Sequence, residues 1–174
     1  MVSGWFPSLL LRSNTTAIAT VRSDTTPTDD LKALPAAEGS QLIVLILSST
    51  SDASAAALVA GLPAHGVTHI DTIIANAGSG KTFKPVLATS LSSLRDDFEV
   101  NTLGPVKLFQ AVYPLLKESS KPKFVVISSA LGSIGYMDPS PNLSYGVSKV
   151  AVNFLVKKVH VEHENIASLA VHPG

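Results

Sequence analysis

The sequence predicts a doubly wound α/β fold on a parallel sheet, because strand-like and helix-like segments alternate along its 174 residues. The strand-like runs are apolar almost throughout instead of alternating, which is typical of parallel strands covered on both faces. They occupy residues 16–21, 41–47, 71–75, 123–128 and 166–171. With 45% apolar and 15% charged residues, the composition is that of a globular chain. We expect one domain over residues 1–174.

Helix candidates lie between the strand-like runs. They occupy residues 28–34, 52–62, 90–117 and 144–163. Ser90 and Ser144 stand where N-cap residues are expected. The long segment 90–117 contains Gly104-Pro105, and a proline inside a helix removes a backbone hydrogen bond. The sequence therefore predicts a kink there, one turn after Asn101.

Charge and cysteine content narrow the choice of partner and compartment. Thirteen basic and thirteen acidic residues leave no net charge, so nothing electrostatic favours nucleic acid or an anionic membrane. No apolar run approaches the roughly 20 residues of a membrane span, and no basic residue precedes the apolar start of the chain as in a signal peptide. The lack of cysteine excludes disulfides and fits a reducing compartment. We expect a cytoplasmic protein with a small-molecule partner.

The most informative local feature is Tyr145 followed four residues later by Lys149. On a helix this spacing puts a phenol and an ammonium group side by side on one face. A nearby cation favours the phenolate, so Tyr145 is expected to release its proton more readily than a free tyrosine, whose pKa is about 10. Such a tyrosine can act as a general acid. The same spacing also fits an ordinary surface pair, so neighbouring motifs must decide between the two interpretations.

Short motifs at strand ends and in helices accompany this pair in a definite order. They are Asn76-Ala77-Gly78, Asn101, Ser129, Tyr145 with Lys149, and Pro173-Gly174. In this order they resemble the short-chain dehydrogenase/reductase family, over residues 14–174. The run Leu-Arg-Asp-Asp-Phe-Glu-Val-Asn at 94–101 is most similar to fungal ketoreductases of the norsolorinic-acid type. The resemblance implies a Rossmann-like fold and, at its finer level, a place in fungal secondary metabolism.

The resemblance also implies catalytic roles in an oxidoreductase that moves hydride between a nicotinamide and a small carbonyl or alcohol substrate. Tyr145 would donate the proton, and Lys149 would lower the pKa of the tyrosine and hydrogen-bond the nicotinamide ribose. Asn101 would hold a water that links Lys149 to solvent. Ser128 and Ser129 compete for the hydroxyl that holds the carbonyl oxygen, and the family pattern of Ser followed three residues later by Gly selects Ser129.

For the cofactor, the sequence favours NADP(H) over NAD(H). Arg22 ends the strand 16–21, where a doubly wound fold meets the adenosine ribose, and an arginine there suits a 2′-phosphate. Asp24 argues for a free 2′-hydroxyl if its loop turns inward. Ser48 stands where the resemblance leads us to expect an aspartate near the adenine, and Asp52 is a displaced substitute. The resemblance further places at the cofactor Asn76, Ala77, Gly78, Tyr145, Lys149, Pro173 and Gly174.

Both ends depart from the family pattern. The opening strand and its G-x-x-x-G-x-G turn are not found before Thr16, and residues 1–12 resemble the end of the following helix, with Gly4 as a remnant of the turn. After Gly174 the family continues through a substrate-covering segment and a last strand. We therefore expect an incomplete domain with unpaired strand edges and weak or no activity. The alternative is a non-catalytic fragment or interaction module, and the long helices resemble those that the family pairs in homo-oligomers.

Two further motifs favour other functions less well. Residues 75–82 nearly spell a phosphate-binding P-loop, but Ala75 replaces the first glycine and Pro85 prevents a helix from starting promptly after Lys81. A P-loop nucleotide-binding protein is thus a remote alternative. His160 and His163 have the i, i+3 spacing of metal ligands, yet the sequence indicates no third ligand. The segment is also charged, which favours a solvated helix face. We expect no metal site.

Overall fold

The computed structural model describes residues 5–174, so Gly4, interpreted above as a remnant of the turn, lies outside the described residues. The chain divides into two compact units, Met1–Ser48 and Ser49–Gly174. The described strands form a two-stranded sheet of order β1-β2 and a three-stranded sheet of order β3-β4-β5, parallel throughout. This confirms the predicted α/β class with parallel strands.

The first unit combines short helices with a pair of parallel strands. It contains α1 (Trp5–Leu10), β1 (Thr16–Val21), α2 (Asp29–Lys32) and β2 (Gln41–Ile46). The strands pair in register from Thr16 opposite Gln41 to Val21 opposite Ile46. Its buried apolar residues are Leu10, Ala17, Ala19, Leu31 and Ile43. The helix α2 is shorter than the predicted segment 28–34, because Thr28 makes no side-chain cap and Pro35 follows closely.

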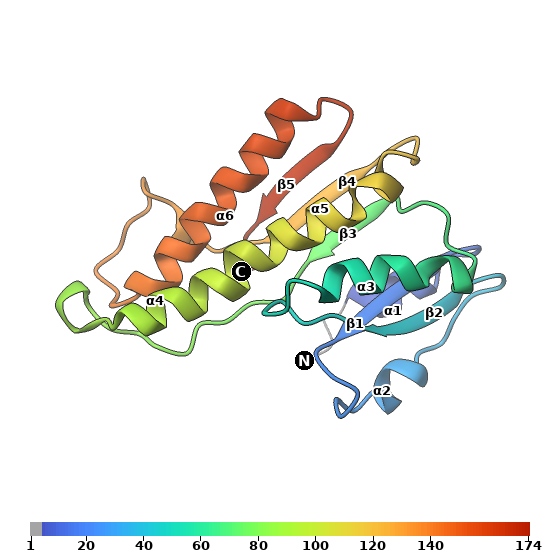
Figure 1. Cartoon of the computed structure of the whole chain (residues 1–174), viewed down its shortest axis with the longest axis horizontal. Helices are drawn as coiled ribbons and strands as arrows, with labels where there is room; N and C mark the ends of the chain where they lie inside the picture. Colours follow the sequence, from blue (N-terminus) through green and yellow to red (C-terminus); the bar gives the residue numbers. More distant parts are fainter. Residues whose placement is uncertain (1–4) are drawn as a thin grey trace. The chain divides into compact units, whose positions relative to one another are not determined.

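The second unit carries every catalytic residue that the sequence predicts. Its helices and helical turns are α3 (Ser54–Gly61), η1 (Leu62–His65), η2 (Val86–Ala88), α4 (Leu91–Phe98), η3 (Glu99–Leu103), α5 (Gly104–Leu116), η4 (Ala130–Gly132) and α6 (Leu143–Glu162). Its strands are β3 (Thr72–Ala75), β4 (Lys123–Ile127) and β5 (Ala167–Val171). Figure 1 shows α5 and α6 lying along the sheet β3-β4-β5. None of the described helices is both long and apolar enough to cross a membrane.

The core of this unit lies between the sheet and the helices α5 and α6. Its buried members are Ala75, Phe109, Leu116, Phe124, Val126, Val152, Val156, Val159 and Ile166. Burying each of the larger side chains contributes about 1.5–3 kcal/mol, so this interface is the main source of stability for the unit. It holds α6 firmly against the sheet, which matters because α6 carries Tyr145 and Lys149.

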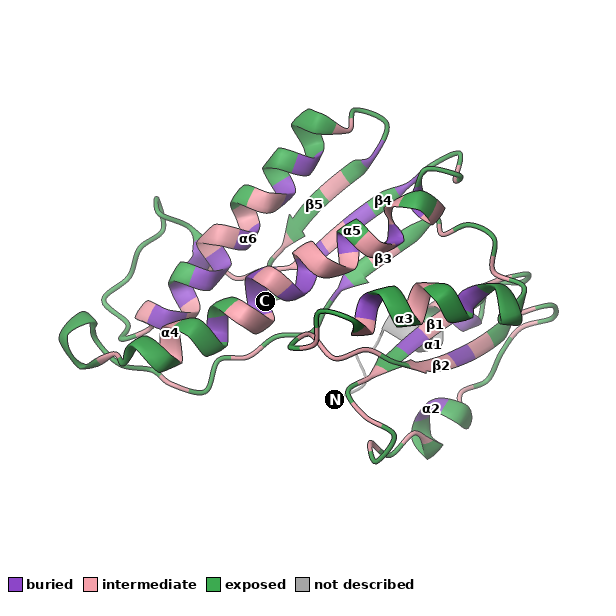
Figure 2. Cartoon of the chain, in the orientation of Figure 1, coloured by how far each residue is buried: buried purple, intermediate pink, exposed green. Residues whose placement is uncertain are grey.

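The opposite face of the three-stranded sheet is partly open, as the exposed stretches of β3 and β5 in Figure 2 show. Ile74 and Leu169 both stand opposite Val125 in the register, and they are 40% and 49% exposed. The continuous apolar runs predicted cover on both faces, so that expectation is wrong for these two strands. The apolar pattern reports the capacity of a strand for burial and not whether a layer covers it.

The predicted helix 90–117 is divided into three parts. Ser90 is its N-cap as predicted, because its hydroxyl oxygen accepts a hydrogen bond of 3.1 Å from the backbone N–H of Ser93. A π-helical turn, η3, contains Asn101 and takes the place of the simple kink. Pro105 then lies in the first turn of α5, where its missing N–H needs no partner. Such π turns occur frequently at functional sites.

The predicted cap of the last helix is wrong by two residues. The helix α6 begins at Leu143 with Asn142 as its N-cap residue, and Ser144 lies inside the first turn. The buried hydroxyl of Ser144 donates a hydrogen bond of 3.3 Å to the carbonyl of Thr82. The local pattern predicted that Ser144 caps the helix, but its hydroxyl bonds instead to a residue that is distant in the sequence.

Candidate active site

The pair Tyr145 and Lys149 lies on one face of α6, as the four-residue spacing predicts. The Nζ atom of Lys149 is 5.5 Å from the centre of the Tyr145 ring. Lys149 is only 4% exposed, and its Nζ donates a hydrogen bond of 2.7 Å to the carbonyl of Ile127 at the end of β4. Burial lowers the pKa of Lys149, because removing an ammonium group from water disfavours its charged form. A buried amine that touches the ring of a half-exposed tyrosine is unusual for a surface pair.

The segment after β4 packs directly on α6 beside this lysine. A Cβ atom at Gly132 would lie 2.8 Å from both the carbonyl carbon and the Cβ of Lys149. Distances this short exclude any side chain, so glycine is required for the backbone of η4 to approach the helix. The predicted Ser129–Gly132 pattern therefore has a physical basis in the packing of this turn.

The two candidate serines have different surroundings. Ser128 is 6% exposed, and its hydroxyl donates a hydrogen bond of 2.6 Å to Oδ1 of Asn153. Ser129 is half-buried and forms the N-cap of η4, where its oxygen accepts a bond of 3.2 Å from the N–H of Leu131. The hydroxyl proton of Ser128 is thus engaged within the protein. The bond from Leu131 uses only the oxygen of Ser129, so the hydroxyl proton of Ser129 is better placed for donation to a substrate.

Asn101 connects the loop after β3 to α6. Its Oδ1 accepts a bond of 2.7 Å from the N–H of Ser79, and its Nδ2 donates to the carbonyl of Ser79 at 2.7 Å and to Oγ of Ser148 at 2.9 Å. Ser148 in turn donates a bond of 2.7 Å to the carbonyl of Tyr145. Asn101 is 1% exposed. Its side chain therefore braces the site, and the water-holding role stays a prediction.

The Asn76-Ala77-Gly78 segment follows β3 as an exposed loop. A Cβ atom at Gly78 would lie 3.4 Å from Oδ1 of Asn101 and 3.8 Å from Nζ of Lys149. The structure therefore brings Gly78, Asn101 and Lys149 together, as predicted for neighbouring parts of one site. Asn76 and Ala77 are exposed beside them, and their roles at the cofactor stay predictions.

The same loop does not form a P-loop. A phosphate-binding loop requires free backbone N–H groups followed at once by a helix. Here the N–H of Ser79 is bonded to Asn101, and after Lys81 the chain runs without regular structure to the short turn η2 at Val86. The remote nucleotide-binding alternative therefore lacks its structural context.

Sequence reasoning missed several residues around Tyr145. A Cβ atom at Gly80 would lie 2.9 Å from Cδ2 of Tyr145, so the loop backbone packs against this ring. The ring of Phe83 is 6.4 Å from the same ring, centre to centre. Ser148 and Asn153 lie three and eight residues after Tyr145, which is helical spacing for one face. The periodicity of α6 was thus the signal that could have found these two polar residues.

The other predicted cofactor residues lie at strand ends. Arg22 is exposed directly after β1 in the first unit, and Pro173 and Gly174 are exposed after β5 in the second. Asp52, the predicted substitute for an adenine-contacting aspartate, is instead 2.7 Å from Nζ of Lys107. Its carboxylate is therefore engaged in an ion pair.

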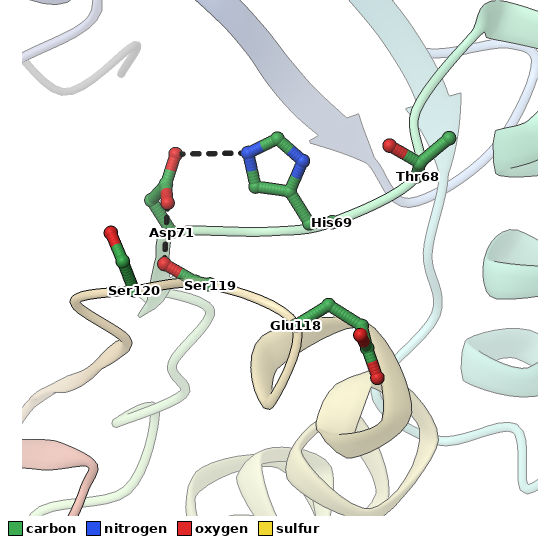
Figure 3. A pocket seen from close by; sticks show the side chains of 6 residues that line it. All are labelled: Thr68, His69, Asp71, Glu118, Ser119 and Ser120. Atoms are coloured by element: carbon green, nitrogen blue, oxygen red, sulfur yellow. Dashed lines mark hydrogen bonds and ion pairs between the residues drawn. The ribbon is translucent and has the colours of Figure 1, made fainter.

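A surface hollow lies at the opposite end of β3 and includes none of these residues. It is lined by Thr68, His69, Asp71, Glu118, Ser119 and Ser120 (Figure 3). Asp71 accepts a hydrogen bond from the Ser119 hydroxyl and lies 3.6 Å from Nε2 of His69. This carboxylate joins the segment before β3 to the loop after α5. Among residues 5–174, no three His, Asp or Glu side chains gather closely enough to hold a metal ion.

Comparison with known proteins identifies the family. A family model described as short chain dehydrogenase matches residues 8–174. The chain belongs to the short-chain dehydrogenase family. Members of this family use nicotinamide cofactors and act on small carbonyl or alcohol substrates, as the resemblance in the sequence implied.

Two curated fungal relatives belong to the same family. A norsolorinic acid ketoreductase from Aspergillus parasiticus is 38% identical over 98% of this chain and 65% of its own length. A short chain dehydrogenase from Penicillium aethiopicum is 40% identical over 98% of this chain and 69% of its own length. The chain thus spans about two thirds of the length of these short-chain dehydrogenases.

Solved structures of the family confirm the fold. The NADPH-bound carbonyl reductase from chicken fatty liver is 28% identical, with a TM-score of 0.87 over 98% of this chain and 73% of that chain. A short-chain dehydrogenase/reductase from Saccharomyces cerevisiae has a TM-score of 0.81 at 26% identity, over 98% of this chain and 65% of that chain. The predicted doubly wound, Rossmann-like class is therefore confirmed.

Proposed function

We propose that this short-chain dehydrogenase is a ketoreductase that uses NADP(H), with Tyr145 as proton donor. The observation that carries the proposal is the buried Nζ of Lys149, 5.5 Å from the centre of the Tyr145 ring. A positive charge at this position stabilises the negative charge that develops on the phenol oxygen as its proton leaves. Tyr145 can then act as a general acid toward the oxygen of a substrate carbonyl.

The residues around the pair fit a nicotinamide cofactor. An ammonium group has three donors, and the bond from Lys149 to Ile127 uses one of them, which leaves two for ribose hydroxyls. The half-buried Gly78 lies beside Lys149 and adds no side chain to the approach to its Nζ atom. A bound nicotinamide supplies the hydride, and the protein supplies position and proton.

The remaining proposed roles concern orientation. Ser129 would donate its hydroxyl proton in a hydrogen bond to the carbonyl oxygen and hold that oxygen toward Tyr145. Asn101, which lies beside Gly78 and Lys149, would fix a water that returns protons through Lys149. The preference for NADP(H) rests on Arg22 after β1, and the NADPH-bound carbonyl reductase among the solved relatives supports it.

Replacing Tyr145 by phenylalanine tests the proposal, because Tyr145→Phe removes one hydroxyl and little volume. We expect kcat for a panel of small aromatic and aliphatic ketones, weak in the wild-type chain, to fall by a further factor of roughly 10²–10⁴, the usual contribution of a general acid, while the affinity for NADPH stays near the wild-type value. Tyr136→Phe is the matched control, since Tyr136 is 66% exposed in the loop before α6. Turnover and NADPH fluorescence titration provide the two measurements.

Two outcomes contradict the proposal. Wild-type turnover by Tyr145→Phe would remove Tyr145 from the chemistry. A purified wild-type chain that neither turns over a ketone nor binds NADPH would instead support the alternative of a non-catalytic interaction module with this fold.

A further inference from the structure

One side chain of α6, Asn153, holds both ends of the segment that carries Ser129. Its Oδ1 accepts a bond of 2.6 Å from the hydroxyl of Ser128, and its Nδ2 donates a bond of 3.0 Å to the carbonyl of Gly132. Ser128 and Gly132 are both buried, so these bonds are shielded from water. The segment between them is therefore tied to α6 at two points by a single amide.

The position of Asn153 on α6 links this segment to the catalytic pair. Asn153 follows Lys149 by four residues and Tyr145 by eight, so the three side chains share one helix face. The close packing of Gly132 on the backbone of Lys149 provides a third tie between the segment and the helix. Any rotation or shift of the segment would thus move the Ser129 hydroxyl relative to the Tyr145 hydroxyl.

Only a carboxamide suits this position. The Ser128 hydroxyl requires an acceptor and the Gly132 carbonyl requires a donor, and an asparagine side chain offers both without charge. A carboxylate of the same shape would place an acceptor against the Gly132 carbonyl, and an apolar side chain would leave two buried groups unpaired. The residue type therefore matches the pair of bonds and is not explained by helix propensity, in which asparagine ranks low.

We propose that Asn153 is a positioning residue that sets the place of the Ser129 hydroxyl relative to Tyr145. This inference rests on the proposed function, in which Ser129 orients the carbonyl of the substrate. A displacement of about 1 Å in a group that orients the substrate can reduce turnover by as much as 10²-fold, so the bridge from Asn153 contributes to kcat without touching substrate or cofactor.

Asn153→Asp tests the bridge, because it keeps the shape and replaces the donor by an acceptor. At neutral pH we expect the amide protons of Leu131, Gly132 and Ser133 to exchange with solvent about tenfold faster, the effect of losing one buried hydrogen bond. The kcat for ketone reduction should fall about tenfold or more, while KM for NADPH stays unchanged. Amide exchange by NMR and steady-state kinetics on the full chain measure these effects.

The pH dependence of this variant separates positioning from a general loss of stability. When the introduced carboxyl is protonated, its O–H can again donate to the Gly132 carbonyl. The protection of these amides and kcat, each taken as a ratio to the wild type at the same pH because intrinsic exchange slows in acid, should therefore recover as the pH falls through the pKa of that carboxyl. Lys149, one turn earlier on the same face, only becomes more protonated in this range. The matched control is Gln110→Glu, the same amide-to-carboxylate change at an exposed site of α5, which should show no recovery.

Ser128→Ala keeps the proposal testable if Asn153→Asp fails to fold, because it removes one bond and leaves no charge. We expect an intermediate increase in exchange at Gly132 and an intermediate loss of kcat. Unchanged exchange in both variants would overturn the role of Asn153, as would exchange that is faster in Asn153→Asp without any recovery in acid. Absence of ketone turnover by the wild-type chain would overturn the proposed function instead, and the exchange measurements would still decide whether Asn153 holds the segment.

Discussion

At the scale of single residues, Lys149 has the most demanding environment. Lys149 is 4% exposed, its ammonium group donates a hydrogen bond to the carbonyl of Ile127, and burial lowers its pKa. The folded state therefore carries a desolvation cost for holding this charge. That cost is understandable if the charge is needed beside Tyr145, since a residue selected for stability alone would be apolar.

Lys149→Met should separate stability from activity. We expect ketone turnover to be lost, while the free energy of unfolding near pH 7 stays equal to that of the wild type or rises by about 1 kcal/mol, because the buried charge is gone. The pKa of Lys149 in the folded state lies below the ordinary value of 10.5, so between these two values the unfolded wild-type chain binds more protons than the folded chain. Wild-type stability therefore rises with pH in that window, and the advantage of the variant shrinks.

Urea denaturation of both proteins at about pH 7 and about pH 9.5 measures this difference. Lys157→Met is the control, because Lys157 is exposed on the same helix. A variant that is strongly destabilised at neutral pH would show that the contacts of Lys149 outweigh its desolvation.

Much of the site could be predicted at this scale, and the exceptions have a common cause. The pairing of Tyr145 with Lys149 depends only on helical spacing, so the sequence was sufficient. The family pattern favoured Ser129 over Ser128, and the structure adds that the Ser128 hydroxyl is already bonded to Asn153. Asn153 was missed because its partners, Ser128 and Gly132, are 25 and 21 residues away along the chain.

At the scale of elements, the π turn η3 is stabilised by an ion cluster that spans it. Lys107 of α5 contacts Glu99 of η3 and lies 2.7 Å from Asp52, just before α3. Glu99 and Lys107 are eight residues apart, beyond the range of side-chain pairs on an uninterrupted α-helix. Hydrogen bonds to Asp52 and Glu99 raise the pKa of Lys107. This cluster joins η3 and α5 to the segment just before α3.

Lys107→Met should lower the free energy of unfolding by on the order of 1 kcal/mol at neutral pH, because two carboxylates lose a shared partner. The pKa of Lys107 is raised in the folded state above its ordinary value of 10.5. The contribution of Lys107 to the free energy of unfolding is therefore fully present below pH 10.5 and is lost only as the pH rises through the folded pKa. Urea denaturation near pH 7 measures the effect. In Lys158→Met, which breaks the more exposed pair with Glu162, we expect a smaller change. Equal effects of the two changes would show that the cluster adds nothing to η3.

Element boundaries could be predicted to within a residue or two wherever the pattern is local. The strand β1 matches the predicted 16–21, and α6 ends one residue before the predicted 163. The π turn could not be predicted, because proline marks where the α-helical hydrogen bonds fail but not how the chain rearranges around the gap. The N-cap at Ser144 failed for a different reason, since its hydroxyl bonds to Thr82 across 62 residues.

At the scale of the whole molecule, cofactor binding should appear as stabilisation of the folded chain. A ligand that binds only the folded state stabilises it by about 2.7 kcal/mol at one hundred times its dissociation constant. We expect NADPH to raise the unfolding temperature more than NADH at equal concentration, because Arg22 would pair with the 2′-phosphate. In Arg22→Ala the two cofactors should become equivalent. Thermal unfolding followed by circular dichroism measures the shifts as differences between unfolding midpoints.

Arg95→Ala provides the control for this experiment, since Arg95 is exposed on α4 and no role at the cofactor is proposed for it. Equal stabilisation of the wild-type chain by NADPH and NADH would contradict the predicted preference. So would a preference for NADPH that survives in Arg22→Ala. Asp24, which argued for a free 2′-hydroxyl, would then become the residue to change next.

The sequence by itself determined the α/β class and the Tyr145–Lys149 pair, because alternation of apolar runs and helical spacing are properties of neighbouring residues. Only the tertiary structure decided which face of the three-stranded sheet is buried and how Asn101 and Asn153 brace the site. Those features depend on bonds between distant positions, such as the bond between Asn101 and Ser148, which are 47 residues apart. Pairings of this kind follow from how the elements pack, and no local pattern encodes them.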